Sequence, residues 1–83
     1  MKFHKLLGHK RTFTIPKWLV EELMLREKSR VRVNVKKFHK YGTIEFFARI
    51  RKHFRITIPR EEAFALGHLK HKDFLEIWIE KVI

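Results

Sequence analysis

Thr14-Ile15-Pro16 and Thr57-Ile58-Pro59 are two copies of one tripeptide, and the rest of the chain is arranged around them. Each copy ends a run of alternating apolar residues and begins a run with helical spacing. Proline sets φ near the helical value and lacks the N–H that a first helical turn leaves unpaired. It also restricts the preceding residue to extended backbone, so Ile15 and Ile58 are expected to end two strands. The sequence thus predicts the same strand-to-helix junction twice.

The two tripeptides belong to an internal duplication of the chain. The spacing between Pro16 and Pro59 also aligns Phe13 with Ile56, and one extra residue in the second half then aligns Val33 with Ile77. We therefore expect one domain made of two strand–strand–helix–strand units, residues 1–40 and 41–83.

Alternation and breaker residues predict six strands and two short helices. The expected strands cover residues 3–7, 12–15, 31–35, 44–50, 56–58 and 75–79, and the expected helices cover residues 16–24 and 59–66. A unit of forty residues cannot bury its own apolar strand faces. We therefore predict a mainly β fold in which six strands close into a pseudo-twofold barrel capped by the helices. An open sheet with helices on one side is the alternative.

The charge balance favours a polyanionic partner. The 83 residues include 20 Lys plus Arg against 9 Asp plus Glu, a formal net charge of +11. Such an excess attracts polyanions, of which nucleic acid is the cellular example. The alternative is a heat-adapted surface, since glutamine is absent and Asn34 is the only asparagine. Heat adaptation explains many charges of both signs but not so one-sided a sum.

Several classes of protein are not expected. The chain has no cysteine, and no apolar run is long enough for a membrane span. No signal peptide opens it, so a cytoplasmic protein is expected. His68 and His71 lack a third ligand at suitable spacing, so neither a metal nor another cofactor is predicted. Ser29 is the only serine, and no catalytic constellation is found, so we expect no enzyme.

The second half of the chain resembles a known family. Thr57-Ile58-Pro59-Arg60-Glu61, followed by Ala65-Leu66-Gly67 and Asp73, is similar to the AbrB/SpoVT/MazE swapped-hairpin domain. The first half repeats the pattern with Met24 in place of the glycine and Ser29 in place of the aspartate. In that family two chains build one barrel together. A single-chain duplicate is similar to the cradle-loop barrels, which implies a monomeric RIFT-type barrel with unswapped hairpins, or swapped hairpins as the alternative.

The resemblance also implies DNA binding, as in transcription regulators and antitoxins. The family uses arginines in the hairpin before the proline and in the helix after it. Arg55 stands at the hairpin position, and Thr12 is its counterpart in the first half. The helix positions are occupied by Val20, Glu21, Ala63 and Phe64. Without those helix arginines, tight base recognition is not expected.

Seven cations near the two junctions are the candidate nucleic-acid-binding residues. They are Lys10, Arg11, Lys17, Arg51, Lys52, Arg55 and Arg60. Paired positive loops can meet the phosphates of a duplex, and each contact displaces a counterion. Duplex DNA is the expected partner; an RNA-associated or ribosome-associated barrel, or a basic surface without a partner, is the alternative. A further cluster, Lys36, Lys37, His39 and Lys40, is expected to be a charged connector between the halves.

Three aromatic residues are predicted to point away from the core. Phe47, Phe74 and Trp78 alternate with the core rows of their strands, and their first-half counterparts are not aromatic. They predict a contact patch for a protein partner or a platform for unpaired bases. The alternative is that barrel twist or a helix covers them.

Overall fold

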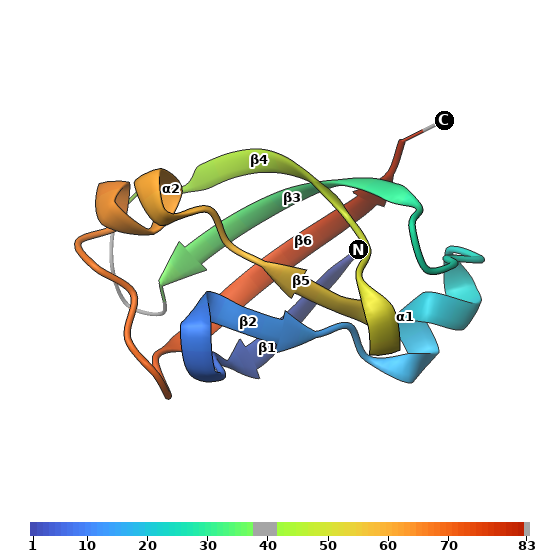
Figure 1. Ribbon diagram of the computed structural model, residues 1–83, viewed down its shortest axis with the longest axis horizontal. Helices are drawn as coiled ribbons and strands as arrows, with labels where there is room; N and C mark the ends of the chain where they lie inside the picture. The colour runs from blue at the N-terminus through green and yellow to red at the C-terminus, as the bar shows by residue number, and fades with distance from the viewer. Residues whose placement is uncertain (38–41, 83) are drawn as a thin grey trace.

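The computed structural model describes residues 1–37 and 42–82, and the same order of elements occurs in both halves (Figure 1). The first half contains β1 (Lys2–Leu6), the 3₁₀ turn η1 (His9–Arg11), β2 (Thr12–Thr14), α1 (Lys17–Glu22) and β3 (Arg30–Lys37). The second half contains β4 (Ile44–Arg49), the 3₁₀ turn η2 (Lys52–Phe54), β5 (Arg55–Thr57), α2 (Arg60–Ala65) and β6 (Phe74–Lys81). The fold is mainly β with two short helices, as predicted.

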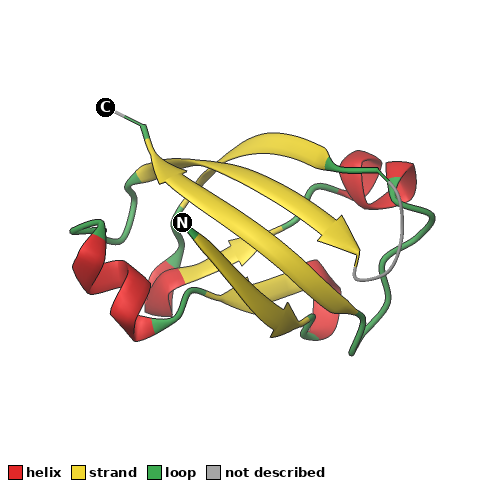
Figure 2. Ribbon diagram, turned by 180° about the vertical axis from the view of Figure 1, so that it is seen from behind, coloured by secondary structure: helices red, strands yellow, loops and turns green. Residues whose placement is uncertain are grey.

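The strands form two antiparallel sheets. The larger sheet has the order β1-β6-β3-β4, and the smaller is the two-stranded ribbon β2-β5. Phe13 lies opposite Ile56 in the ribbon, and Val33 lies between Phe46 and Ile79 in the larger sheet. Figures 1 and 2 show the ribbon lying across one face of the four-stranded sheet. The helices α1 and α2 lie at opposite ends of the ribbon.

Closure of all six strands into one barrel is not confirmed. In the described residues, no ladder joins the ribbon to the larger sheet. The ribbon is attached through its turns, where Gly8 N donates to Thr12 O and Arg51 N to Arg55 O, each at 2.9 Å. The edge strands of the larger sheet are β1 and β4, and the chain leaves each of them through a 3₁₀ turn, η1 or η2, before the three-residue ribbon strand begins, so the ribbon pairs with itself instead of extending either edge. The predicted boundary between the halves, together with His39 and Lys40, lies outside the described residues.

One hydrophobic core lies between the two sheets. It contains 19 buried apolar side chains, contributed by both halves, and no buried polar or charged side chain among the described residues. The alternation of β3 and β6 sends Val31, Val33 and Val35 and Leu75, Ile77 and Ile79 into this core. Each such side chain gains about 1.5–3 kcal/mol from burial.

The tripeptides form the junctions between the ribbon and the helices, but their boundaries differ from the prediction by one residue. Pro16 and Pro59 both have φ −58°, and ψ is 142° and 145° respectively, so each caps its helix rather than beginning it. The ribbon strands end before the isoleucines, whose amides donate to the opposite half: Ile15 N to Phe54 O at 2.9 Å and Ile58 N to Arg11 O at 2.8 Å. Neither helix among the described residues is long and apolar enough to cross a membrane.

Candidate nucleic-acid interface

The outer side of the β2-β5 ribbon carries hydroxyl and cationic side chains. Phe13 and Ile56 point into the core, so their strand neighbours face outward. Thr12 Oγ1 and Thr57 Oγ1 lie 3.1 Å apart, and Arg51 Nη1 donates to Thr57 Oγ1 at 3.2 Å. We call this surface the ribbon face. It comprises Lys10, Thr12, Thr14, Arg51, Lys52, Arg55 and Thr57.

The ribbon face is hollowed by two shallow cavities. The larger, of about 420 Å³, is lined by Gly8, His9, Lys10, Thr12, Thr14 and Arg55. The smaller, of about 180 Å³, is lined by Thr12, Arg51, Lys52 and Arg55. The two cavities share Thr12 and Arg55, and neither has a carboxylate among its lining residues in the described part of the chain. Four of the seven predicted cations therefore border one continuous surface.

Turn geometry explains why neighbouring cations separate. Lys10 and Arg11 have φ of 55° and 58°, and His53 and Phe54 have φ of 62° and 56° at the equivalent places. Left-handed backbone costs non-glycine residues roughly 1–2 kcal/mol each. It also reverses the chain sharply, so Lys10 lines the ribbon face whereas Arg11 lines a different cavity.

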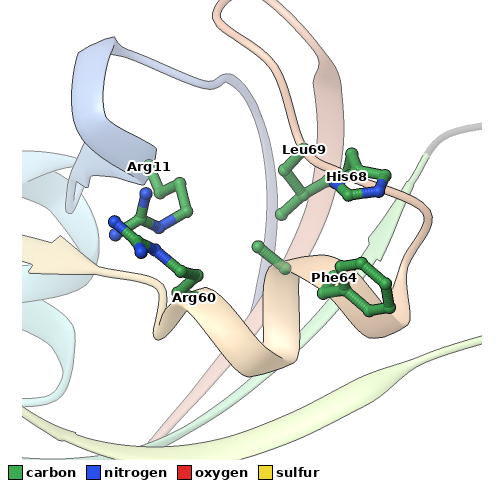
Figure 3. Close-up of a pocket in the computed structure, with 6 residues that line it drawn as sticks. Arg11, Arg60, Phe64, His68 and Leu69 are labelled. Atoms are coloured by element: carbon green, nitrogen blue, oxygen red, sulfur yellow. The ribbon is translucent and has the colours of Figure 1, made fainter.

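A third cavity, here called the α2 pocket, is lined by two more of the predicted cations (Figure 3). It has a volume of about 280 Å³ and is lined by Arg11, Arg60, Ala63, Phe64, His68 and Leu69. Arg11 Nε donates to the carbonyl of Ile58 at 3.1 Å, which anchors that side chain. Lys17 lies apart from both surfaces, in a cavity beside α1 that also includes Glu21 and Phe54.

The ribbon-face cations have no carboxylate partner within the described residues. The ion pairs found there lie on other parts of the surface and join Lys2 and His4 to Glu76, Arg32 to Glu45 and Glu80, and Lys37 to Asp73. The hydrogen bond and charge of Lys2, aided by His4 and Lys36, hold the pKa of Glu76 below its ordinary value. Among the described residues, ion pairs thus occur on the outer side of the four-stranded sheet and none occurs on the ribbon face.

The predicted aromatic residues share the outer side of the four-stranded sheet but do not gather there. Phe47 is 57% exposed and Phe74 42%, whereas Trp78 is half-buried, with Lys2 Nζ at 5.8 Å from its ring centroid. Glu76 separates Phe74 from Trp78 along β6. Arg32 lies directly opposite Phe47. The face alternates aromatic and charged side chains instead of presenting one apolar patch.

Some residues of these surfaces were missed by sequence reasoning. Thr12, Thr14 and Thr57 share the outward side of their strands with Arg55, which strand alternation could have indicated. The stacking of His9 on His71, with ring centroids 3.9 Å apart, depends on a tertiary contact that no local pattern encodes. No group of three potential metal ligands occurs in residues 1–37 and 42–82.

Comparisons with known proteins identify the fold only. No protein-family model matches the sequence, and no curated protein matches it. The chain is similar in structure to PHS018 from Pyrococcus horikoshii, whose solution structure is known, with a TM-score of 0.82 and 20% sequence identity. The match covers 96% of this chain and 88% of that chain. At this identity the likeness extends to the fold and to no activity.

Proposed function

We propose that this protein binds nucleic acid, duplex DNA in the first place, through the ribbon face. The observation that carries the proposal is the set of four cations, Lys10, Arg51, Lys52 and Arg55, around strand hydroxyls and without a carboxylate partner in the described residues. Arginine, lysine and threonine side chains are the groups that proteins use to contact phosphates. A phosphate there would replace repulsion among like charges by attraction.

The proposed contacts are to the backbone rather than to the bases. Direct readout needs an element that enters a groove with side chains able to pair with base edges. The ribbon has three residues in each strand, and its outward positions carry short threonines beside Arg55. Ala63, at one of the family's helix arginine positions, is buried. We therefore expect weak binding with little sequence preference.

The resemblance to the AbrB/SpoVT/MazE family supports a role near transcription regulation, as a cytoplasmic monomer. We further propose that the two sheets are parts of one cradle-loop barrel whose ribbon is held by its turns. The shared core supports this proposal, as do the two hydrogen bonds between the halves that the amides of Ile15 and Ile58 donate. If the two sheets form one closed unit, the amide hydrogens of Ile15 and Ile58 should exchange as slowly as those of β3 and β6. Fast exchange at both would contradict it.

The binding proposal is tested by titration against duplex DNA, structured RNA and single strands at two salt concentrations. With about four phosphates neutralised, log K should fall against log salt with a slope of about −4. Replacing Arg51, Lys52 and Arg55 by alanine should flatten the slope by up to about 3 and weaken binding evenly across sequences. RNA preferred over DNA would favour the RNA-associated alternative.

The control removes the same formal charge from the outer side of the four-stranded sheet. Arg30, Lys36 and Arg49 point outward there and take part in none of the ion pairs of the described residues. Their replacement by alanine should change affinity much less than replacement of the ribbon-face cations. Equal losses from both triple variants would mean diffuse attraction without a site.

A protein-interaction module is the second candidate function, favoured by the exposure of Phe47. Aromatic side chains are enriched at the centres of protein interfaces. The same side of the sheet carries the ion pairs Arg32–Glu45 and Lys2–Glu76. A partner that covers this side would have to remove water from these charges or supply new charged groups to bind them. Absence of nucleic-acid binding even at low salt would favour this candidate.

A further inference from the structure

The α2 pocket is a second cationic site, separate from the ribbon face. Arg11 and Arg60 both line it, and Figure 3 shows their guanidinium groups on the same side of the pocket. Arg11 uses Nε for the Ile58 carbonyl, which holds the side chain in place and leaves both terminal nitrogens for another acceptor. Among the described residues, no carboxylate lines the pocket, although Glu61 and Glu62 belong to the same helix. Two unneutralised guanidinium groups in one pocket favour an anion, since planar arginine forks match phosphate oxygens.

The other side of the same pocket is apolar and aromatic. Phe64 is 65% exposed although it is a large apolar residue, and His68 packs against it edge-on with ring centroids 4.6 Å apart. Ala63 and Leu69 are buried and contribute to the lining. In Figure 3, Phe64 and His68 lie across the pocket from the two arginines. An exposed aromatic ring of this kind suits a planar base, because every base has a π-face for stacking.

The equivalent cavity of the first half lacks this combination. Phe54 occupies the place of Arg11, Lys17 that of Arg60 and Glu21 that of Phe64. That cavity contains a carboxylate and has no guanidinium group in its lining. The combination of two guanidinium groups with an exposed aromatic ring therefore occurs in the second of these two cavities and not in the first, so a ligand that needs both is expected to bind once per chain.

The α2 pocket and the ribbon face are neighbours across η1. Lys10 lines the ribbon face and the next residue, Arg11, lines the pocket. A strand held on the ribbon face can thus reach the pocket by passing the turn. The volume of about 280 Å³ lies just below the range for small-molecule sites, about 300–1,000 Å³, which limits the ligand to a single nucleotide.

We propose that the α2 pocket binds a phosphate monoester that carries a base, as found at the phosphorylated end of a nucleic-acid strand. The two arginines bind the phosphate, and Phe64 stacks on the base. This inference rests on the proposed nucleic-acid function and adds the recognition of an end to it. A free mononucleotide has the same chemistry and is the other source of such a ligand.

The test compares short single strands with a 5′-phosphate, a 3′-phosphate or hydroxyl ends only. A terminal phosphate adds about 1.5 to 2 negative charges, so a longer hydroxyl-ended strand of equal net charge serves as the control for simple attraction. We expect one of the phosphorylated strands to bind about tenfold more tightly than the charge-matched control. Adenosine monophosphate titrated alone identifies the source: affinity equal to that of the phosphorylated strand indicates a free nucleotide, and much weaker affinity indicates a strand end.

Matched variants connect this preference to the pocket. Arg60→Gln and Phe64→Ala alter exposed side chains, so the fold should be retained, and each should reduce the tenfold preference to about twofold or less. Lys17→Gln removes the same charge at the equivalent place of the first half and should leave the preference unchanged. Chemical-shift changes at His68 and Leu69 should accompany binding of the phosphorylated strand.

The outcomes separate this inference from the proposed function. Equal affinity for phosphorylated and charge-matched hydroxyl-ended strands would overturn the pocket inference while leaving ribbon-face binding intact. A preference reduced equally by Arg60→Gln and Lys17→Gln would overturn it as well. Loss of Arg51, Lys52 and Arg55 should weaken all strands but keep the ratio between phosphorylated and control strands.

Discussion

The two halves of the molecule share a backbone but not a surface. Left-handed residues recur at equivalent positions: Lys10 and His53, Arg11 and Phe54, Met24 and Gly67, Lys28 and Lys72. The outward side chains differ, since Gly8 corresponds to Arg51 and Thr12 to Arg55. The core and the turns are thus alike in both halves, whereas the cations around the ribbon come unequally from the two. The comparison teaches that the fold constrains the apolar rows and leaves the outer positions free to diverge.

The largest effect is expected where the halves are most alike. Ile15 and Ile58 are 2% and 0% exposed at equivalent places in the core. Replacing either by alanine should lower the free energy of unfolding by about 2–5 kcal/mol, because a buried side chain is lost and a cavity remains. Urea denaturation measures both losses, which should agree within about 1 kcal/mol. A much smaller loss on one side would show that the halves do not share one core equally.

The next comparison exchanges the ribbon residues that differ. Arg55→Thr gives the second half the residue of the first and should weaken binding to duplex DNA about tenfold at low salt. A hydrogen bond to a charged group contributes about 1.5–3 kcal/mol, of which about 1.4 kcal/mol corresponds to tenfold. Thr12→Arg should strengthen binding and steepen the salt slope by about 0.9. Titration at several salt concentrations checks both, and an unchanged slope in both variants would remove these positions from the interface.

A smaller effect is expected where the helices end. Met24 has φ of 54° at the place where the second half has Gly67, with φ of 79°. Left-handed backbone is unfavourable for methionine and ordinary for glycine. Since Met24 is 75% exposed, Met24→Gly should raise the free energy of unfolding by about 1 kcal/mol in urea denaturation. Gly67→Ala is the reciprocal control and should destabilise; a stabilising Gly67→Ala would contradict the argument.

The smallest effect concerns an exchange of charge on the larger sheet. Glu76 occupies in β6 the place that Arg32 occupies in β3, and the hydrogen bond from Lys2 keeps its pKa below the ordinary 4.5. Because the folded pKa is lowered, the stabilisation is present above pH 4.5 and is lost as pH falls through the folded value. Glu76→Gln should remove the loss of stability that protonation of Glu76 causes below pH 4.5. The measurement is the free energy of unfolding of variant and parent at several pH values below 4.5, and the difference between them should shrink as the pH falls. A constant difference would contradict the assignment.

Local patterns determined the elements of this protein. Alternation in residues 31–35 and 75–79 predicted two central strands whose inward side chains are fully buried, because period-two burial is a property of the strand itself. The two prolines predicted the junctions to within one residue, since the restriction on φ is covalent. The same patterns correctly placed Phe47 and Phe74 on an exposed side.

Only the tertiary structure decided which elements meet and which charges remain unpaired. Nothing in the sequence near Thr12 shows that it lies opposite Thr57, or that Lys10 and Arg11 face different cavities. The number of sheets was likewise open, and the ladders form two where one closed barrel was expected. The physical reason is that turn conformation and strand pairing depend on contacts between residues far apart in the chain. Local propensity and periodicity carry no information about those contacts.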